Sequence, residues 1–447
     1  MRFFAGRGFS KACTGCLLAA IGALGPLVAP AQDGTIGELT PADKVARSRM
    51  VYQQGLAAFQ KADTASFVQL LDEAVAYRPD HPTLIYNAAC AHAIRRDTEP
   101  ALAYLERIAA MGLVADPVED PDLGLLPRRE RWLQMLERVE ENARPVVHST
   151  PAFSLTDSTL LTEGIAHDPA TGSFFVSSIR ERKIVQVVPG GSVRDFGEDA
   201  PLWSVFALAV ETGDRSRLWA CTAALANTPG VGADDVGRSG VRIYDIASGA
   251  VLRSVDLPVD GRHHVLNDLA LAPDGTAYLS DNQTGDLFRL GPRDTSLEKV
   301  STGMQLLSPQ GIVSNDDGSA LYIADYSIGL VRIDLAEESG VALSPIEHTS
   351  LLGIDGLVRH GHDLIAIQNG VRPHRVLRIE LSDDGRTVTD VSVLEAAHPE
   401  YDEPTLGVVV DDDLYYIANS QWGSLAEDGS VSSGYPVHEP VVLRLPL

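Results

Sequence analysis

Residues 310–334 read QGIVSNDDGSALYIADYSIGLVRID, and this stretch shows the pattern on which the fold depends. Three short runs rich in aliphatic and aromatic residues occupy 310–313, 320–325 and 330–334, with turn-forming residues between them. Runs of this length bounded by Asn, Asp, Gly and Ser are typical of β-strands joined as hairpins. The stretch therefore predicts one small antiparallel sheet.

The same three-strand pattern occurs six times between residues 150 and 447, in units of roughly 40 to 60 residues. The third run of each unit is easy to recognise, for example GVRIYD at 240–245 and VVLRL at 441–445. Small antiparallel sheets repeated around a channel avoid long exposed strand edges. We therefore predict a six-bladed β-propeller at 150–447, with a strand near 151–156 completing the last blade.

The preceding segment, residues 41–145, has a helical composition with apolar residues three and four positions apart. Gly55 and Ala89 are separated by 34 positions, as are Ala74 and Ile108. This spacing resembles the tetratricopeptide repeat, a unit of two helices in about 34 residues. About two repeats and a capping helix near 128–141 are expected. Such a domain would dock a protein partner or cover one face of the propeller.

The first 31 residues predict a secretory signal peptide, since a positively charged start precedes a short apolar run at 16–28 and the small residues Ala29-Pro30-Ala31. Export to the periplasm or outside the cell is therefore expected. No later segment is apolar for long enough to predict a membrane span. Beyond this leader only Cys90 and Cys221 remain, which we expect to be buried thiols, with a disulfide between them as the alternative.

The charge of the chain limits its partners. Its 447 residues include 36 Lys and Arg against 61 Asp and Glu, so that the formal net charge is −25. A surface of this sign repels phosphate backbones and anionic lipid. We therefore expect no nucleic-acid partner.

The first strands of the six units all begin at the same end of a propeller channel, so that the residues opening them converge on one point. Four of these residues carry a side-chain oxygen, which is the donor that Ca²⁺ prefers in its shell of about six to eight ligands. No His or Cys is among them, which disfavours copper and closed zinc sites. The alternative is that Asp and Asn before Gly are ordinary turn residues. The six openers are Glu163, Phe206, Asn267, Gln310, Asp355 and Leu406.

Several further residues lie near these openers in the sequence. His263-His264 precede Asn267 and provide either a general base or a polar surface loop. Tyr326, Asn369 and Trp422 follow the second strands of their blades, and we expect them to be scaffold or to face the opposite end of the channel.

Two loops are also candidates for the entrance of the channel. Asp402-Glu403 precedes the sixth blade and forms either an entrance rim or an ordinary acidic loop. The Gly-rich stretch 229–240 lies between strands of the second blade and is expected to be a long loop, with a lid over the channel as one reading. It does not open a helix and is not a dinucleotide site.

Taken together, these motifs resemble the SMP-30/gluconolactonase/LRE-like family of six-bladed propellers. The resemblance covers about two-thirds of the chain and rests on motifs that are specific only as a set. They are Thr162-Glu163-Gly164, Leu266-Asn267-Asp268 with Pro273-Asp274-Gly275, Ser308-Pro309-Gln310-Gly311-Ile312 with Leu321-Tyr322-Ile323-Ala324-Asp325, and Ile354-Asp355-Gly356-Leu357.

The resemblance implies a divalent cation, with Ca²⁺ the expected ion, and hydrolysis of a lactone. Glu163 and Asp355 would be its carboxylate ligands, and Asn267 a further ligand or a substrate contact. Gln310 stands where the family has Asn, and its longer side chain would shift the cation or displace a water. This departure puts catalysis in question more than the fold.

We therefore expect an exported, metal-dependent hydrolase acting on a small lactone or similar ester. The cation would polarise the carbonyl group, and Asp355, Asp268 or His264 would orient or deprotonate the attacking water. The alternative is a non-catalytic propeller that binds a protein or ligand and holds a structural cation. A sugar- or quinone-dependent dehydrogenase has no support, because no basic cluster surrounds the openers.

Overall fold

The computed structural model describes residues 35–197, 202–213 and 216–447. The predicted signal peptide at 1–31 lies outside the described residues. Within them, a helical part precedes six sheets, as predicted, and each sheet has a fourth strand beyond the three that the sequence pattern indicated. No described helix has the length and apolar character needed to cross a membrane. Cys90 and Cys221 are both buried and free, so that the disulfide alternative is not realised.

The helical part contains α2 (Pro41–Gln60), α3 (Thr64–Tyr77), α4 (Pro82–Ile94), α5 (Thr98–Ala110) and α6 (Glu130–Asn142). Local signals start these helices, because Thr40 caps α2 through the N–H of Asp43, and Pro82 occupies the first position of α4. The chain between α5 and α6 forms a short 3-10 turn, η2 (Leu123–Leu125), that contacts α4. A helical domain is thus confirmed, whereas its tetratricopeptide nature is not.

The propeller begins with β1 (Thr150–Ser154) and then forms its blades in chain order. The first and second blades contain β2 (Thr162–Asp168), β3 (Ser173–Ser178), β4 (Lys183–Val187) and β5 (Val193–Phe196), then β6 (Ser204–Glu211), β7 (Arg217–Ala223), β8 (Ser239–Asp245) and β9 (Val251–Asp256). The third contains β10 (Leu266–Leu271), β11 (Ala277–Asp281), β12 (Asp286–Leu290) and β13 (Glu298–Lys299).

The fourth blade contains β14 (Pro309–Ser314), β15 (Ala320–Asp325), β16 (Gly329–Asp334) and β17 (Ser339–Ala342). The fifth contains β18 (Ile354–His360), β19 (Asp363–Gln368), β20 (Arg375–Leu381) and β21 (Val388–Ala396). The sixth contains β22 (Gly407–Val410), β23 (Asp413–Ile417) and β24 (Val441–Pro446), and β1 completes it by antiparallel pairing with β24. The ring is thus closed by the strand that the sequence predicted.

The strands β2, β6, β10, β14, β18 and β22 contact one another in sequence around the channel and are therefore the innermost strands. Their spacing explains two glycines that follow openers. A Cβ atom added at Gly164 would lie 2.4 Å from the carbonyl oxygen of Phe206, and one at Gly356 would lie 2.3 Å from that of Thr405. Glycine stands there because neighbouring blades approach too closely for a side chain.

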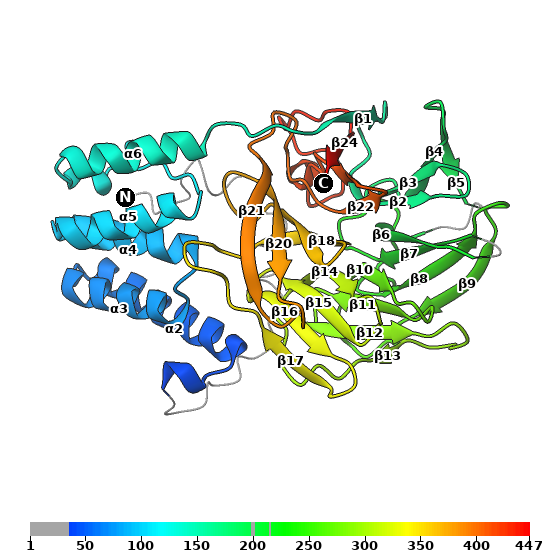
Figure 1. Ribbon diagram of the computed structural model, residues 1–447, viewed down its shortest axis with the longest axis horizontal. Helices are drawn as coiled ribbons and strands as arrows, with labels where there is room; N and C mark the ends of the chain where they lie inside the picture. Colours follow the sequence, from blue (N-terminus) through cyan, green and yellow to red (C-terminus); the bar gives the residue numbers. More distant parts are fainter. Residues whose placement is uncertain (1–34, 198–201, 214–215) are drawn as a thin grey trace.

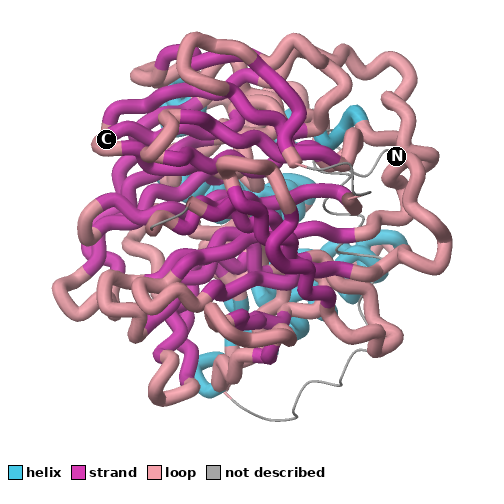
Figure 2. Tube along the Cα trace, turned by 90° about the vertical axis from the view of Figure 1, so that its right-hand side faces the viewer, coloured by secondary structure: helices cyan, strands magenta, loops and turns pink. Residues whose placement is uncertain are grey.

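The helical domain packs against the end of the propeller at which the inner strands begin (Figures 1 and 2). The N–H of Val114 donates to the carbonyl of Arg372 over 2.8 Å. Arg372 lies in the loop between β19 and β20. This loop is at the end where the inner strands begin, because Gln368 at the end of β19 pairs with Ile354 at the start of β18. The linker to the propeller is also held, since Val146 pairs with Ala396 at the end of β21.

A cavity of about 1020 Å³ occupies the channel toward the other end. All six inner strands line it, from the level of Asp268 to the turns that follow these strands. The helices and this cavity are therefore associated with opposite ends of the propeller.

Candidate functional site

The structure places the six openers at one end of the channel. Glu163, Asn267, Gln310 and Asp355 each occupy the second position of their inner strand, in β2, β10, β14 and β18. Phe206 lies near the start of β6 and its ring packs on Trp422, with 6.2 Å between the ring centroids. The polar openers therefore form one layer, with an aromatic pair at its side.

Glu163 is held by two donors from the segment after β23. Its Oε2 accepts hydrogen bonds from Ser420 Oγ at 2.9 Å and from the indole N–H of Trp422 at 2.8 Å. The residue is 8% exposed. Burial, followed by the charge of Asp355, raises the pKa of Glu163 well above its usual range. An ionised Glu163 therefore requires a compensating positive charge.

Asp355 is oriented by a neighbouring amide. Asn369 Nδ2 donates to Asp355 Oδ2 over 2.6 Å and to the carbonyl of Pro404 over 3.0 Å. The hydroxyl of Tyr326 donates to Asn369 Oδ1 over 3.1 Å, which fixes the orientation of the amide. Burial raises the pKa of Asp355 to about 6, and the hydrogen bond from Asn369 opposes this shift.

Glu403 adds a third carboxylate to this end of the channel. Burial, together with the charges of Asp402 and Asp355, raises the pKa of Glu403 to about 8, and backbone N–H groups of Trp422 and Gly423 act in the opposite direction. Its Oε2 is buried and has no hydrogen-bond partner among the described residues. Glu403 lies in the loop before β22, at the same end as Asp355, and its side chain is buried there.

The two amide openers contact each other. Asn267 Nδ2 donates to Gln310 Oε1 over 2.8 Å, and Asn282 Nδ2 approaches the same oxygen at 3.4 Å. Asn267 Oδ1 accepts, from the residues that the structure describes, only a long contact of 3.4 Å from Ser280 Oγ. The Gln310 oxygen is therefore engaged by amides, whereas the Asn267 oxygen is the better placed of the two to bind a further group.

Asp268 bridges two inner strands. Its Oδ1 accepts the N–H of Leu269 at 2.8 Å, and its Oδ2 accepts the N–H of Ile312 at 3.0 Å. Burial raises the pKa of Asp268 to about 7, although both backbone bonds lower it. The contacts give Asp268 a structural task between the third and fourth blades.

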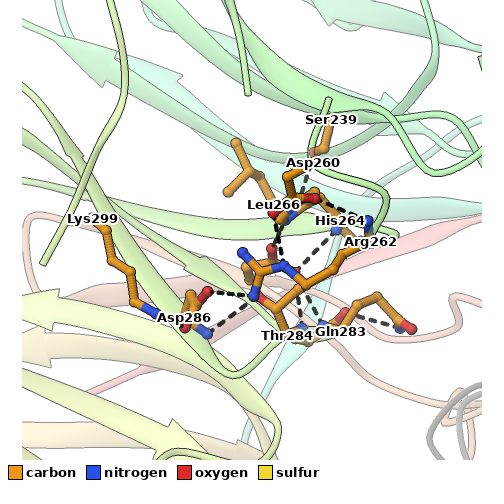
Figure 3. A network of polar contacts seen from close by, with 12 residues as sticks. Ser239, Asp260, Arg262, His264, Leu266, Gln283, Thr284, Asp286 and Lys299 are labelled. Atoms are coloured by element: carbon orange, nitrogen blue, oxygen red, sulfur yellow. Dashed lines mark hydrogen bonds and ion pairs between the residues drawn. The ribbon is translucent and has the colours of Figure 1, made fainter. Parts of the chain in front are cut away.

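His264 lies in a separate network (Figure 3). Its Nδ1 lies 2.6 Å from Asp281 Oδ2 and its Nε2 lies 3.1 Å from Asp260 Oδ1. The hydrogen bond to Asp281 raises the pKa of His264, and the residue is 4% exposed. His263 is exposed, so that the surface-loop reading holds for one member of the pair only. No hydrogen bond among the described residues joins His264 to the polar openers.

Three residues expected to be scaffold or to face the opposite end lie beside the openers, two of them in direct contact with one and the third through Asn369. Trp422 donates to Glu163, Asn369 donates to Asp355, and Tyr326 donates to Asn369. The expectation of the opposite end was wrong because the second strand of a meander runs back toward the start of the first. Residues that follow the second strand therefore lie beside the openers, and that position was the signal that would have identified them.

The Gly-rich stretch belongs to the connection between β7 and β8, at the same end as the openers. Arg182 donates to the carbonyl of Pro229 within this loop over 3.2 Å. A Cβ atom added at Gly429 of the sixth blade would meet the carbonyl of Asn227 at 2.5 Å. The loop is therefore held between the first and sixth blades.

The donor set fits a hard divalent cation in its chemistry. Glu163, Asp355 and Glu403 are buried or half-buried, and none of them is paired with Lys, Arg or His among the described residues. The partnerless Oε2 of Glu403 and the weakly engaged Oδ1 of Asn267 are available oxygens. In the part of the chain that the structure describes, however, no three His, Cys, Asp or Glu side chains are grouped as a metal site. A fitting donor set therefore combines carboxylates with amides.

No family model and no curated protein matches the chain. Solved structures similar to it include a PQQ-bound aldose sugar dehydrogenase from Streptomyces coelicolor. The two sequences are 16% identical, the match covers 68% of this chain and 98% of the dehydrogenase, and the TM-score is 0.46. The calcium-binding protein regucalcin from Agrobacterium tumefaciens has 19% identity, coverage of 66% and 93%, and a TM-score of 0.44. A gluconolactonase from Xanthomonas campestris has 16% identity, coverage of 68% and 98%, and a TM-score of 0.44.

Regucalcin and gluconolactonase structures, to which the sequence motifs pointed, are thus among the similar structures. These similarities concern the six-bladed fold alone. The named proteins differ in activity, and one fold supports many chemistries. The function must therefore be argued from the site.

Proposed function

We propose that the protein is a divalent-cation-dependent hydrolase of small lactones or related esters, with its site at the helix-covered end of the channel. One observation carries this proposal: the carboxylates of the buried Glu163 and the half-buried Asp355 share one layer with amide openers and have no cationic partner among the described residues. A bound Ca²⁺ would compensate these charges, polarise an ester carbonyl and stabilise the oxyanion that forms.

In this proposal Glu163, Asp355 and Asn267 hold the cation. Ser420 and Trp422 fix Glu163 through Oε2, which leaves Oε1 for ligation. Asn369 fixes Asp355 through Oδ2, which leaves Oδ1. Gln310 supports Asn267 by accepting its amide N–H, so that the longer side chain acts beside the cation as an orienting group.

The attacking water needs a base, and Asp355 is the candidate that the contacts favour. Both oxygens of Asp268 accept backbone N–H groups, and both ring nitrogens of His264 contact carboxylates. Asp355 would give up its contact with the cation at Oδ1, Glu163 and Asn267 would keep the cation in place, and the freed Oδ1 would accept a proton from water as the water oxygen bonds to the carbonyl carbon. The ring C–O bond then breaks, the leaving oxygen takes up the proton, and a hydroxy acid is the product.

A second candidate function is a non-catalytic protein that binds a ligand or a protein through the same end of the channel. The packing of the helical domain on that end favours it, because helical repeats commonly bind peptides. In that case the cation would be structural and the helices would carry the protein partner. Export by the predicted leader belongs to both proposals.

Calcium titration by calorimetry on the chain from residue 32 tests the proposal, with Glu163→Gln and Asp355→Asn as site variants. Asp384→Asn serves as the matched control, because Asp384 is an exposed turn residue. We expect calcium binding that both site variants abolish and the control retains. Hydrolysis of one or more lactones by the wild type, lost in the same variants that lose calcium binding, supports the hydrolase. Binding without turnover favours the second candidate, and absence of divalent-cation binding overturns the site.

A further inference from the structure

The loop that orients Asp355 is also a docking point of the helical domain. The connection between β19 and β20 begins with Asn369, whose amide donates to Asp355 Oδ2 over 2.6 Å. Three residues later, the carbonyl of Arg372 accepts the N–H of Val114 from the helical domain over 2.8 Å. Between them Val371, at 4% exposure, is part of the apolar core of the helical domain. One short loop therefore joins the helices to a candidate cation ligand.

A second loop makes the same connection. Tyr326, which donates to Asn369 over 3.1 Å, opens the turn between β15 and β16. The next residue, Ser327, accepts a hydrogen bond at its carbonyl from the guanidinium of Arg78 at the end of α3. The residue that fixes the amide of Asn369 is therefore adjacent to the residue that the helical domain holds.

The two loops also enclose the segment that leads into Asp355. The N–H of Gly353 donates to the carbonyl of Tyr326 over 3.0 Å, and the N–H of Gly370 donates to the carbonyl of Gly353 over 2.9 Å. A Cβ atom added at Gly353 would lie 2.6 Å from the Cα atom of Gly370. The three segments are thus in direct backbone contact, and a displacement of either loop moves the backbone two residues before Asp355.

We propose that the helical domain positions the Asp355 carboxylate, because its contacts with the two loops fix Asn369 and Tyr326, and that loss of these contacts weakens cation binding in the channel. This inference rests on the proposed cation site. Asn369 and Tyr326 are then positioning residues, and the helical domain is a structural component of the site. Groups that orient the ligands of a metal commonly control its affinity.

Two variants with matched controls separate this role from general stability. Arg78→Ala removes the bond to Ser327, whereas Arg107→Ala removes a comparable bond to the carbonyl of Pro79 within the helical domain. Tyr326→Phe removes the bond to Asn369. Its control, Tyr322→Phe, lies on β15, the strand that ends just before Tyr326, and removes a bond to the carbonyl of Gly385 away from the openers.

The first readout is the Ca²⁺ dissociation constant of the full chain, measured by calorimetry. We expect Arg78→Ala and Tyr326→Phe to raise it between about twofold and thirtyfold, the usual range for residues that act through others. The two controls should stay within about twofold of the wild type. Arg78→Lys keeps a cationic donor and should recover part of the affinity. Equal affinities in wild type, Arg78→Ala and Tyr326→Phe would overturn the inference.

The second readout is hydrogen exchange of the backbone at 353–357, measured by mass spectrometry with calcium removed. We expect Arg78→Ala to exchange faster there than Arg107→Ala, since its loop contact is lost. Equal exchange in the two variants would overturn the inference. This readout does not need a bound cation. A wild type that binds no divalent cation would therefore overturn the proposed function, while the exchange rates still decide whether the helices hold Asp355.

Discussion

The indole N–H of Trp422 donates a 2.8 Å hydrogen bond to Oε2 of Glu163, although the two residues are 259 positions apart. The first inner strand and the last blade meet here because β1 closes the ring beside β24. Trp422, which belongs to the last blade, therefore stabilises the negative charge of Glu163, which belongs to the first.

Replacement of Trp422 tests whether its hydrogen bond to Glu163 contributes to the affinity for the proposed cation. Trp422→Phe removes a hydrogen bond that lowers the pKa of Glu163, so that ionisation becomes less favourable and cation affinity should fall by about tenfold or more. Calorimetric titration with Ca²⁺ measures this change. Trp219→Phe is a matched control, because Trp219 donates to Glu211 over 2.9 Å near the other end of an inner strand. An equal loss of affinity in both variants would contradict the prediction.

The carboxylate cluster predicts how stability depends on pH. Burial raises the pKa of Asp355 to about 6 and that of Glu403 to about 8, above the values of an unfolded chain. Groups with a raised folded-state pKa stabilise the fold when protonated, and this contribution is lost as pH rises. The cation-free protein should therefore lose stability between about pH 4 and pH 8 relative to a variant without these groups.

Thermal unfolding in a chelator across this pH range provides the measurement. The double variant Asp355→Asn, Glu403→Gln should show a flatter profile and a higher midpoint at pH 8 than the wild type. Added Ca²⁺ should raise the midpoint of the wild type at pH 8 and have little effect on the double variant. If the wild-type midpoint changed with pH in parallel with that of the double variant, the raised pKa values of Asp355 and Glu403 would be refuted.

A substitution of Asp268 distinguishes a structural role of this residue from a catalytic one. An Asn side chain has one acceptor oxygen where the carboxylate serves two backbone N–H donors, of Leu269 and Ile312. Asp268→Asn should therefore cost about 1–3 kcal/mol of unfolding free energy, because one buried donor loses its partner. Denaturant unfolding measures this cost, and Asp274→Asn, in the exposed turn of the same blade, is the control. Lost lactone turnover with unchanged stability would instead assign Asp268 to catalysis.

Close packing between blades predicts a severe effect at Gly356. A methyl group there would overlap the carbonyl oxygen of Thr405, which is backbone and moves only with the neighbouring inner strand. Gly356→Ala should cost about 1–3 kcal/mol or more. Gly124→Ala, which meets no atom within 4 Å, should leave stability nearly unchanged. Chemical denaturation of both variants checks the difference, and equal stabilities would refute the packing argument.

Much of the architecture was predictable because it depends on local patterns. Strand runs such as 320–325, the turns that bound them and their sixfold repetition predict the blades, and the extra strand near 151–156 predicts the closure of the ring. The common position of Glu163, Asn267, Gln310 and Asp355 at the start of their inner strands follows from the same repetition.

The surroundings of these openers depended on contacts that no local pattern encodes. Trp422 and Asn369 reach the openers, and Tyr326 reaches Asn369, because antiparallel strands return to the same end of the channel. The burial of Glu403 follows from the loop conformation before β22. His264 precedes the opener Asn267 in the sequence, but its ring nitrogens contact Asp281 and Asp260 and not the openers.

The sequence by itself determined a helical segment, six repeated sheets and a set of oxygen-bearing side chains at one end of a channel, because hydrophobic period, turn chemistry and repeat length act over short stretches of chain. Only the tertiary structure decided which donors orient Glu163 and Asp355, and that the helices hold the loops beside Asp355 through Arg78 and Val114. The physical reason is that these contacts join segments far apart in the chain, and they form only when the ring closes and the helical domain packs on its end.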